Sequence, residues 1–420
     1  MRQAWVAGLV LAAACGGGES GGPEAATTRD SAGITIVENS GTGWPAGQGW
    51  TLSAEPVVQL GGAADDPALD FGRVTGALLL ADGGIAVANG ATSEVRLFGA
   101  DGTHRSSSGR SGSGPGEYTA IAGMWKGAGD SLLVLDIMVR RLTVLGPDGG
   151  VGRSFALGGM GGSMVPSSDG TVSFAIPAGV LADGSMLGLS QSFQINAARE
   201  GAFRDSVPAV RYGPDGAVRD TLGWFPGIEM EQLTLNFAGQ SFSTPTPVPL
   251  GRNTVVLAAG DRFYVATNDA WEVEVWNPAG GLAGIYRVAM APRPLNSAGI
   301  ATHREEQIAL MDAQMGGANV PPQLREQMVN RINSASYPPS LPYIAAILRD
   351  DAGNLWVQEQ DQPGDQTPRF AVLDPAGALL GYVDMPARFR PTHITTDRVV
   401  GIWQDDDDVE YVRVYGLDRG

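Results

Sequence analysis

The stretch VLGPDG (Val144–Gly149) decides the fold, because close variants of it return along the chain. In each copy an apolar strand end runs into a turn where Pro presets φ, Asp bonds its own backbone and Gly accepts a positive φ. The other copies are LFGADG (97–102), RYGPDG (211–216), VWNPAG (275–280), VLDPAG (372–377) and VYGLDR (414–419). The pattern predicts six equivalent hairpin turns.

A second hairpin precedes most of these turns. GALLL-ADGG-IAVAN (76–89) and IAAIL-RDDAG-NLWVQEQ (344–360) are two examples, each an apolar strand, a turn and a returning strand. The returning strands are apolar on both faces, which is typical of strands in the middle of a sheet. Each unit therefore holds four antiparallel strands. Six such units predict an all-β fold, a six-bladed β-propeller of four-stranded antiparallel blades.

The predicted ring needs a closing strand. The last copy reaches residue 420 without a fourth strand, which would leave an open sheet edge. We therefore expect WTLSAEPVVQL (50–60) to supply the outer strand of the last blade and to close the ring. ITIVENS (34–40) is expected to lie beside it, so that residues 34–420 form a single propeller domain.

The long interval between the fourth and fifth copies predicts a helical insertion at about 297–337. ATHREEQIALMDAQM (301–315) contains Thr302 and Glu305 at capping-box spacing, which predicts a helix start there. A second helix follows GGANVPP (316–322), with Pro322 in its first turn. Methionines on both helices would offer adaptable apolar contacts.

The N-terminus predicts export. Arg2 is followed by an apolar run that is too short to span a bilayer, so residues 1–14 are interpreted as a signal peptide. LAAAC (11–15) resembles a bacterial lipobox, and Cys15 is the only cysteine of the chain. The resemblance implies that Cys15 carries lipid and that Gly-rich residues 15–33 form a flexible tether to the membrane, the outer membrane rather than the inner one. The alternative is a plain signal peptide with an incidental cysteine.

The amino-acid composition limits the classes of ligand and cofactor that we expect this chain to bind. A formal net charge of -17 disfavours nucleic acid, because binding phosphates requires a basic surface. The three histidines have no metal-ligand spacing, and His104 and His303 are expected to face solvent. We expect a monomer without a cofactor, with Ca²⁺ left open.

The connector GRSGSGPGEY (109–118) superficially resembles a nucleotide-binding loop. Its glycine spacing does not fit a dinucleotide fingerprint, and Glu117 stands where a P-loop needs a cation. We expect Arg110 to pair with Glu117 across the loop. The connector, with IAVAN, GNLWV (353–357) and ITIVENS, resembles those of bacterial six-bladed β-propeller lipoproteins related to the NHL-repeat proteins. The resemblance implies a six-bladed ring in the cell envelope, outside the cytoplasm, and it supplies no catalytic residues.

Polar residues near the ends of the second strands are the candidate site, on the face that also holds the helical insertion. They are Asn89, Asp136, Asn268, Glu359 and Gln404, joined by Arg110 and Glu117 of the connectors. One interpretation is a Ca²⁺ site, since Ca²⁺ takes six to eight oxygen ligands. The interpretation that we favour is that strand-end Asn and Asp bond neighbouring backbone. The acidic run QDDDDVE (404–410) is interpreted as a solvated loop.

Two classes of function follow from these observations. The first is an interaction module that binds a protein, peptide or glycan. The second is a Ca²⁺-dependent hydrolase or lactonase, similar to gluconolactonases, at the channel mouth. We favour binding over catalysis and leave the enzyme question open, because no nucleophile or metal motif stands out in the sequence.

Overall fold

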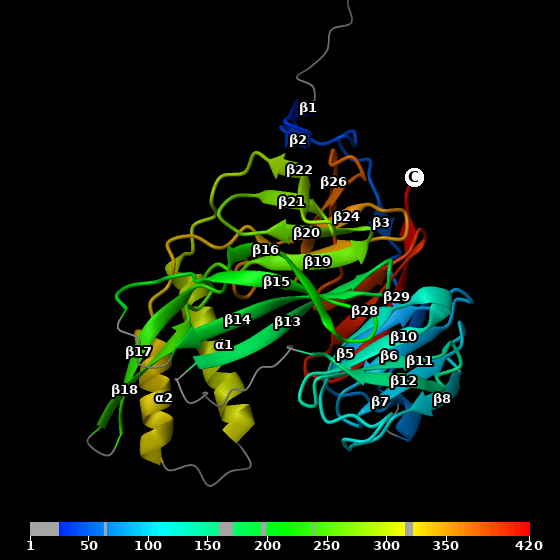
Figure 1. Cartoon of the computed structure of the whole chain (residues 1–420), viewed down its shortest axis with the longest axis horizontal. Coiled ribbons are helices and arrows are strands. Elements are labelled where there is room, and N and C mark those ends of the chain that lie inside the picture. The colour runs from blue at the N-terminus through cyan, green and yellow to red at the C-terminus, as the bar shows by residue number, and fades with distance from the viewer. Residues whose placement is uncertain (1–24, 63–64, 159–170, 195–198, 238–239, 316–321) are drawn as a thin grey trace, which may run out of the picture.

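The structure, a computed structural model, describes residues 25–62, 65–158, 171–194, 199–237, 240–315 and 322–420. The described chain is mostly β, and its sheets have a propeller-like arrangement (Figure 1). The predicted signal peptide (1–14), Cys15 and the first part of the predicted tether lie outside the described residues.

Most strands belong to runs, which we define as sets of four hydrogen-bonded antiparallel strands. Three runs form separate sheets. Their strands are β5 (Val74–Leu79), β6 (Ile85–Asn89), β7 (Glu94–Phe98) and β8 (His104–Ser108); β9 (Ile121–Lys126), β10 (Leu132–Asp136), β11 (Arg141–Leu145) and β12 (Val151–Ala156); and β23 (Ile344–Arg349), β24 (Leu355–Glu359), β25 (Arg369–Leu373) and β26 (Leu379–Asp384). The second strands β6 and β10 are buried along their whole length, as expected for central strands.

Two further runs share a ten-stranded sheet, because their first strands pair in parallel. These strands are β13 (Thr171–Leu181), β14 (Met186–Gln194), β15 (Ser206–Tyr212) and β16 (Val218–Pro226); and β19 (Val255–Gly260), β20 (Arg262–Ala266), β21 (Glu272–Asn277) and β22 (Gly281–Val288). Gly179 permits this approach: it has a φ of +125°, and a Cβ there would lie 2.4 Å from the carbonyl oxygen of Ala258.

The last sheet contains β27 (Phe389–Ile394), β28 (Arg398–Gln404) and β29 (Glu410–Asp418). The N-terminal strands β3 (Thr51–Leu52) and β4 (Val58–Leu60) both pair antiparallel with β29. The prediction that residues 50–60 supply the outer strand of this sheet is confirmed. The prediction of a sixth hairpin turn at 414–419 is wrong, because residues up to Asp418 belong to β29. This copy ends in Arg419 instead of Gly, and its backbone pairs with β3.

Residues 34–40 do not lie beside residues 50–60. Strand β2 (Ile34–Asn39) pairs in parallel with β22, and β1 (Ala26–Ser31) covers its other edge. Residues 26–31 are therefore part of a sheet and not of a flexible tether. The edge of β22 supplies backbone N–H and C=O groups with which β2 pairs. Val37 of β2 is buried in the adjoining core.

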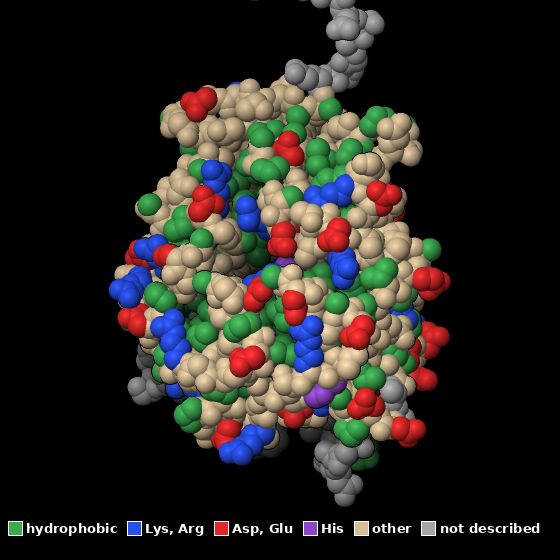
Figure 2. All heavy atoms as spheres, turned by 90° about the vertical axis from the view of Figure 1, so that its right-hand side faces the viewer, with side chains coloured by type: hydrophobic (Ala, Val, Ile, Leu, Met, Phe, Trp, Pro, Cys, Tyr) green, Lys and Arg blue, Asp and Glu red, His purple; other side chains and the backbone are tan. Residues whose placement is uncertain are grey.

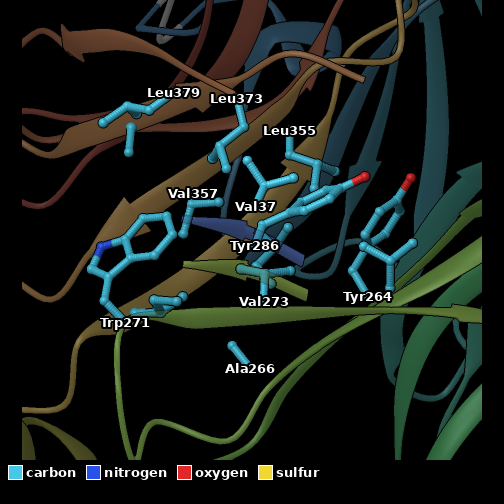
Figure 3. Close-up of a cluster of buried hydrophobic side chains, with 14 residues drawn as sticks. Val37, Tyr264, Ala266, Trp271, Val273, Tyr286, Leu355, Val357, Leu373 and Leu379 are labelled. Atoms are coloured by element: carbon cyan, nitrogen blue, oxygen red, sulfur yellow. The ribbon is translucent and has the colours of Figure 1, made fainter. Parts of the chain in front are cut away.

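The buried apolar side chains gather between neighbouring runs. Figure 3 shows the cluster in which Val273 and Tyr286 of one run meet Leu355 and Val357 of the next. Comparable clusters join each described run to the following one, and β27–β29 with Leu60 to β5–β7. Because each buried cluster is shared by two runs, no run can bury its apolar faces alone.

Two insertions project from the runs and lie together at the lower left of Figure 1. One is the helix pair α1 (Ser297–Met315) and α2 (Pro322–Ser334), which confirms the prediction of helices here. The start of α1 was predicted at Thr302 and is wrong: the helix begins at Ser297, and Asn296 accepts the N–H of Gly299 at 2.7 Å. The other insertion is a hairpin of β17 (Met230–Phe237) and β18 (Gln240–Pro247), which the sequence analysis missed.

The role of β4 is tested by Leu60→Ala. Leu60 is 2% exposed and packs against Val400, Val412 and Val414, so its truncation should lower the free energy of unfolding by about 3 kcal/mol. Val57→Ala is the matched control, since Val57 is 56% exposed, and should change it by less than about 0.5 kcal/mol. Denaturant unfolding followed by tryptophan fluorescence measures both. Equal effects of the two variants would show that β4 lies outside the cooperative unit.

Candidate functional site

Asn89 and Asp136 act as backbone clasps at the ends of second strands. Both are fully buried. Asn89 Oδ1 accepts the N–H of Gly72 at 3.0 Å, and its Nδ2 donates to the carbonyl of Asp70 at 2.9 Å. Asp136 accepts N–H groups from Thr119 at 2.5 Å, Met138 at 3.0 Å and Val139 at 3.2 Å. Each side chain thus holds the segment that enters the first strand of its own run.

Asn268 makes a wider clasp, which joins two runs. Its Nδ2 donates to the carbonyls of Asn253 at 2.7 Å and Ile344 at 2.9 Å. Its Oδ1 accepts the N–H groups of Tyr343 at 3.1 Å and Ile344 at 2.8 Å. This set fills the hydrogen-bonding capacity of a carboxamide. Asn268 itself has a φ of +67°, a conformation that asparagine tolerates better than most residues.

Glu359 occupies the equivalent place in the next run but has no such partner. It lies opposite Ile344, as Asn89 lies opposite Val74 and Asp136 opposite Ile121. The clasped N–H groups belong to the residue two positions before Val74 and Ile121. The corresponding residue here is Pro342, which has no N–H. Glu359 is 6% exposed, its Oε1 has no hydrogen-bond partner among the described residues, and burial raises its pKa.

The other predicted residues lie apart from these clasps. Gln404, at the end of β28, is exposed. The predicted pairing of Arg110 with Glu117 is confirmed, with an Nε–Oε1 distance of 2.8 Å. Glu117 also accepts the N–H of Gly114 at 2.8 Å, and this bond and Arg110 lower its pKa. The carboxylate therefore already uses a backbone N–H of this loop, and its negative charge would repel a phosphate.

A second group of polar contacts lies at the turns between first and second strands. Leu79 donates its N–H to His393 Nδ1 at 3.2 Å, and His393 Nε2 lies 3.5 Å from Asp351. The hydrogen bond from His393 lowers the pKa of Asp351. Figure 2 shows the face on the right-hand side of Figure 1, where acidic and basic side chains are interspersed around a central hollow. The mixture of both signs favours no single charged ligand there.

A cavity of about 570 Å³ lies between the helices and the hairpin. We call it the helix–hairpin groove. Its lining is mainly apolar. The residues are Glu231, Leu233, Thr246, Pro247, Val248, Pro249, Leu250, His303, Gln307, Leu310, Met311, Met328, Arg331, Ile332, Ser334, Ala335 and Tyr337. Leu310 is 52% and Met328 36% exposed, so apolar side chains of both helices remain open to a ligand.

Polar contacts fix the walls of this groove. A two-bond fork between Arg325 and Asp312, at 2.7 and 2.6 Å, joins α2 to α1. His303 Nδ1 lies 3.0 Å from the hydroxyl of Tyr337, and the guanidinium of Arg304 lies 5.3 Å from the centre of the Tyr337 ring. The expectation that His303 faces solvent is wrong. The side chain is half-buried, and burial lowers its pKa.

A second cavity, of about 390 Å³, continues the groove along β17. The two share Glu231, Val248 and Tyr337. The second is also lined by Arg199, Gly201 and Ala202 on one side and by residues 336–339 on the other. Gln232 lines it as well, and both the Nε2 and the Oε1 of this side chain are buried without a hydrogen-bond partner among the described residues.

Among the described residues, no group of three or more His, Cys, Asp or Glu side chains is placed to share a metal ion. None of the described helices is long and apolar enough to cross a membrane.

Comparisons with known proteins give distant structural matches. No family model and no curated protein sequence matches the chain. A Bacteroides fragilis protein provisionally described as exported aligns with 92% of this chain and 99% of its own, at 12% identity and a TM-score of 0.47. A DUF4221-family member from Bacteroides vulgatus aligns with 89% and 99%, at 10% identity and a TM-score of 0.44. A gluconolactonase from Xanthomonas campestris aligns with 89% and 99%, at 13% identity and 0.38. At these values the similarity carries no argument about the chemistry of this chain.

The helix–hairpin groove was not predicted, although the sequence does indicate the helices that form one half of it. The helices follow from apolar spacing, but β17 and β18 were not recognised within the interval between the third and fourth copies. Within this stretch, QLTLNF (232–237) alternates between polar and apolar residues, which is typical of a half-buried strand. That the hairpin meets helices more than 50 residues later depends on tertiary structure, and no local pattern records it.

The protonation of Glu359 can be tested through stability. Because burial raises its pKa in the folded state, the folded chain holds the proton more tightly than the unfolded chain does. The free energy of unfolding should therefore fall as the pH rises from the ordinary glutamate range through the raised pKa. Glu359→Gln should remove this loss and stabilise the protein at neutral pH relative to the parent chain.

Unfolding by denaturant at a series of pH values from 4 to 8 measures the effect. Glu326→Gln, an exposed position on α2, controls for the loss of one carboxylate. Parallel pH profiles of the parent chain and Glu359→Gln would contradict the prediction.

Proposed function

We propose that this chain is a lipid-anchored, six-bladed β-propeller of the bacterial cell envelope that binds a protein, peptide or glycan ligand in the helix–hairpin groove. The observation that carries the proposal is the groove itself: two insertions outside the propeller meet, and leave an apolar surface between them open.

The number of blades is inferred from the order of contacts. The first strands of the runs contact one another in sequence, β5 with β9, β9 with β13, β13 with β19, β19 with β23 and β23 with β27, and β27 returns to β5. The buried clusters follow the same circuit. A ring of six blades accounts for both observations, and it is also what the turn repeat favours.

The cellular location is inferred from the N-terminal sequence. Residues 1–14 have the charge and apolar length of a signal peptide, and LAAAC ends at a cysteine that could take a lipid. We propose an extracytoplasmic monomer held at the outer membrane through Cys15. Lipid chains contribute roughly 0.8 kcal/mol per buried methylene to membrane binding.

A ligand of the groove would gain from apolar contact. Covering Leu310, Met328 and their neighbours is favourable by about 25 cal/mol per Å² of apolar surface removed from water. Methionine adapts to ligands of differing shape because its chain is unbranched and polarisable. The apolar lining favours a protein or peptide over a glycan.

The alternative of a Ca²⁺-dependent lactonase has less support. Such a site needs several oxygen atoms that converge on one ion. The oxygens of Asn89, Asp136 and Asn268 already accept backbone N–H groups, and those three side chains clasp different strands. We therefore propose binding without a metal or another cofactor.

The anchor is tested by Cys15→Ser. In a bacterial host that processes lipoproteins, the parent chain should fractionate with membranes and label with a radioactive fatty acid. The variant should be released in soluble form and remain unlabelled. An unlabelled parent chain would contradict lipidation and leave the alternative of a plain signal peptide.

The groove is tested by Leu310→Asp combined with Met328→Asp. The probes are reduced, carboxamidomethylated lysozyme, which is a permanently unfolded polypeptide, and a soluble peptidoglycan oligosaccharide, both followed by calorimetry. We expect the polypeptide to bind, and the variant to weaken binding by about tenfold or more, because a charge would be buried in an apolar groove.

Val409→Asp is the matched control, since Val409 is a 41% exposed apolar residue outside the groove. It should bind like the parent chain. Equal binding by the groove variant and the parent chain, for every probe that binds, would overturn the groove as the binding site.

A further inference from the structure

We propose that the ligand of the groove is an extended peptide segment with apolar side chains, which adds as a strand to the free edge of β17 and whose main chain is held by Gln232. This inference rests on the proposed function and deepens it, because it selects one of the three ligand classes. It depends on the backbone N–H and C=O groups of the β17–β18 hairpin that point outward.

In β17, the backbone N–H and C=O groups of every second residue point toward β18. The hydroxyl of Thr246 donates to the carbonyl of Glu231 at 3.4 Å, and that of Ser243 to the carbonyl of Leu233 at 3.5 Å, so these carbonyls point toward β18. The residues between them must point their N–H and C=O groups the other way. Met230 shows this directly, because it exchanges two hydrogen bonds with Phe203, at 2.8 and 2.9 Å, on the outer edge.

Beyond Met230, the outer edge of β17 has no partner among the residues that the structure describes. Among the residues that the structure describes, Phe203 is the last partner on this edge, and β17 otherwise pairs with β18 alone. The next outward-facing residue is Gln232. Unpaired strand edges of this kind are templates for an added strand.

The opposite edge of the hairpin offers no N–H for such pairing across from Met230 and Gln232. Pro245 lies opposite Gln232 and Pro247 opposite Met230, so both prolines occupy outward-facing positions of β18. Proline has no N–H to offer there. A strand can therefore be added on one side of the hairpin, the side of the second cavity.

The side chain of Gln232 matches a peptide group. Its Nε2 and Oε1 are both buried and without a partner among the described residues. Leaving such atoms unpaired is unfavourable, because they lose their hydrogen bonds to water and gain none in return. In an extended strand the N–H and C=O of one residue point to the same side, so that residue can satisfy both atoms of a carboxamide at once. Side chains of the added strand would alternate toward the two cavities, which accept apolar groups.

A glycan fits this surface less well. Sugars are commonly held by stacking on open aromatic faces. Tyr337 is the aromatic residue that lines both cavities, and Arg304 already covers its ring while His303 meets it edge-on. The edge of β17 and the carboxamide of Gln232 both complement a polypeptide backbone.

The test uses blocked, uncharged peptides of alternating leucine and threonine, about eight residues long, in three forms. One is unmodified, one carries N-methyl groups on its odd residues and one on its even residues. A strand added to β17 uses the N–H groups of one parity for the ladder. We expect one methylated form to lose binding and the other to keep it, with the full chain as receptor and calorimetry as readout.

Variants then locate the contact. Gln232→Leu should weaken the unmodified peptide by about tenfold, the effect of losing one or two hydrogen bonds, whereas Gln191→Leu, which removes another unpaired amide nitrogen outside both cavities, should not. Gln232→Glu keeps the size of the side chain and should also weaken binding, and circular dichroism verifies that each variant folds.

The outcomes separate the two proposals. Equal binding of both methylated forms, or full binding by both Gln232 variants, overturns strand addition. In that case loss of binding in the Leu310→Asp, Met328→Asp variant would still support the groove. Binding of the oligosaccharide instead of the peptides, abolished by that same groove variant, would overturn the peptide inference and leave the binding function standing.

Discussion

The pairing of residues 51–60 with β29 is the contact on which the remaining structure depends. Every described run shares its cores with two neighbours, so each apolar face is covered only if the circuit is closed. Leu60 contributes to the cluster that joins β29 to β5, the two sheets that are farthest apart in sequence. The N-terminal segment also binds β26, because the backbone N–H groups of Gly43 and Trp44 donate to the carbonyls of Leu379 and Leu380. It thus contacts three runs in succession.

At the ends of strands, side chains form hydrogen bonds with backbone groups that the sheets leave unpaired. Asn39 donates to the carbonyls of Arg287 and Gly377 and accepts the N–H of Leu379, which ties β2 to two runs. Asn268 does the same between β19–β22 and β23–β26. These residues are polar and buried, a combination that often marks a functional site. Here their hydrogen bonds are used within the fold.

The parts of the fold that follow from local chemistry were predictable from the sequence. The glycine of each of the five GxDG or PAG turns has a φ between +81° and +95°, as the turn type requires. The clasping role favoured for strand-end Asn89 and Asp136 is also a local effect, because their partners lie within the same run. The partner of β2, the clasp of Asn268 and the meeting of hairpin and helices could not be predicted, because each joins segments far apart in the chain. The orphaned Glu359 depends on Pro342, and that connection becomes visible only through the strand register.

Glu359 and Gln232 both have buried polar atoms without a partner among the described residues, and they differ in how these atoms can be satisfied. Glu359 is a carboxyl group, and a proton neutralises it inside the fold, which is the direction of its raised pKa. Gln232 is a carboxamide and has no charge to lose, so its donor and acceptor can be satisfied only by another molecule or by rearrangement. A structural core would gain from an apolar residue at that place. A carboxamide beside an open strand edge and an apolar groove is instead what a receptor for a polypeptide main chain requires.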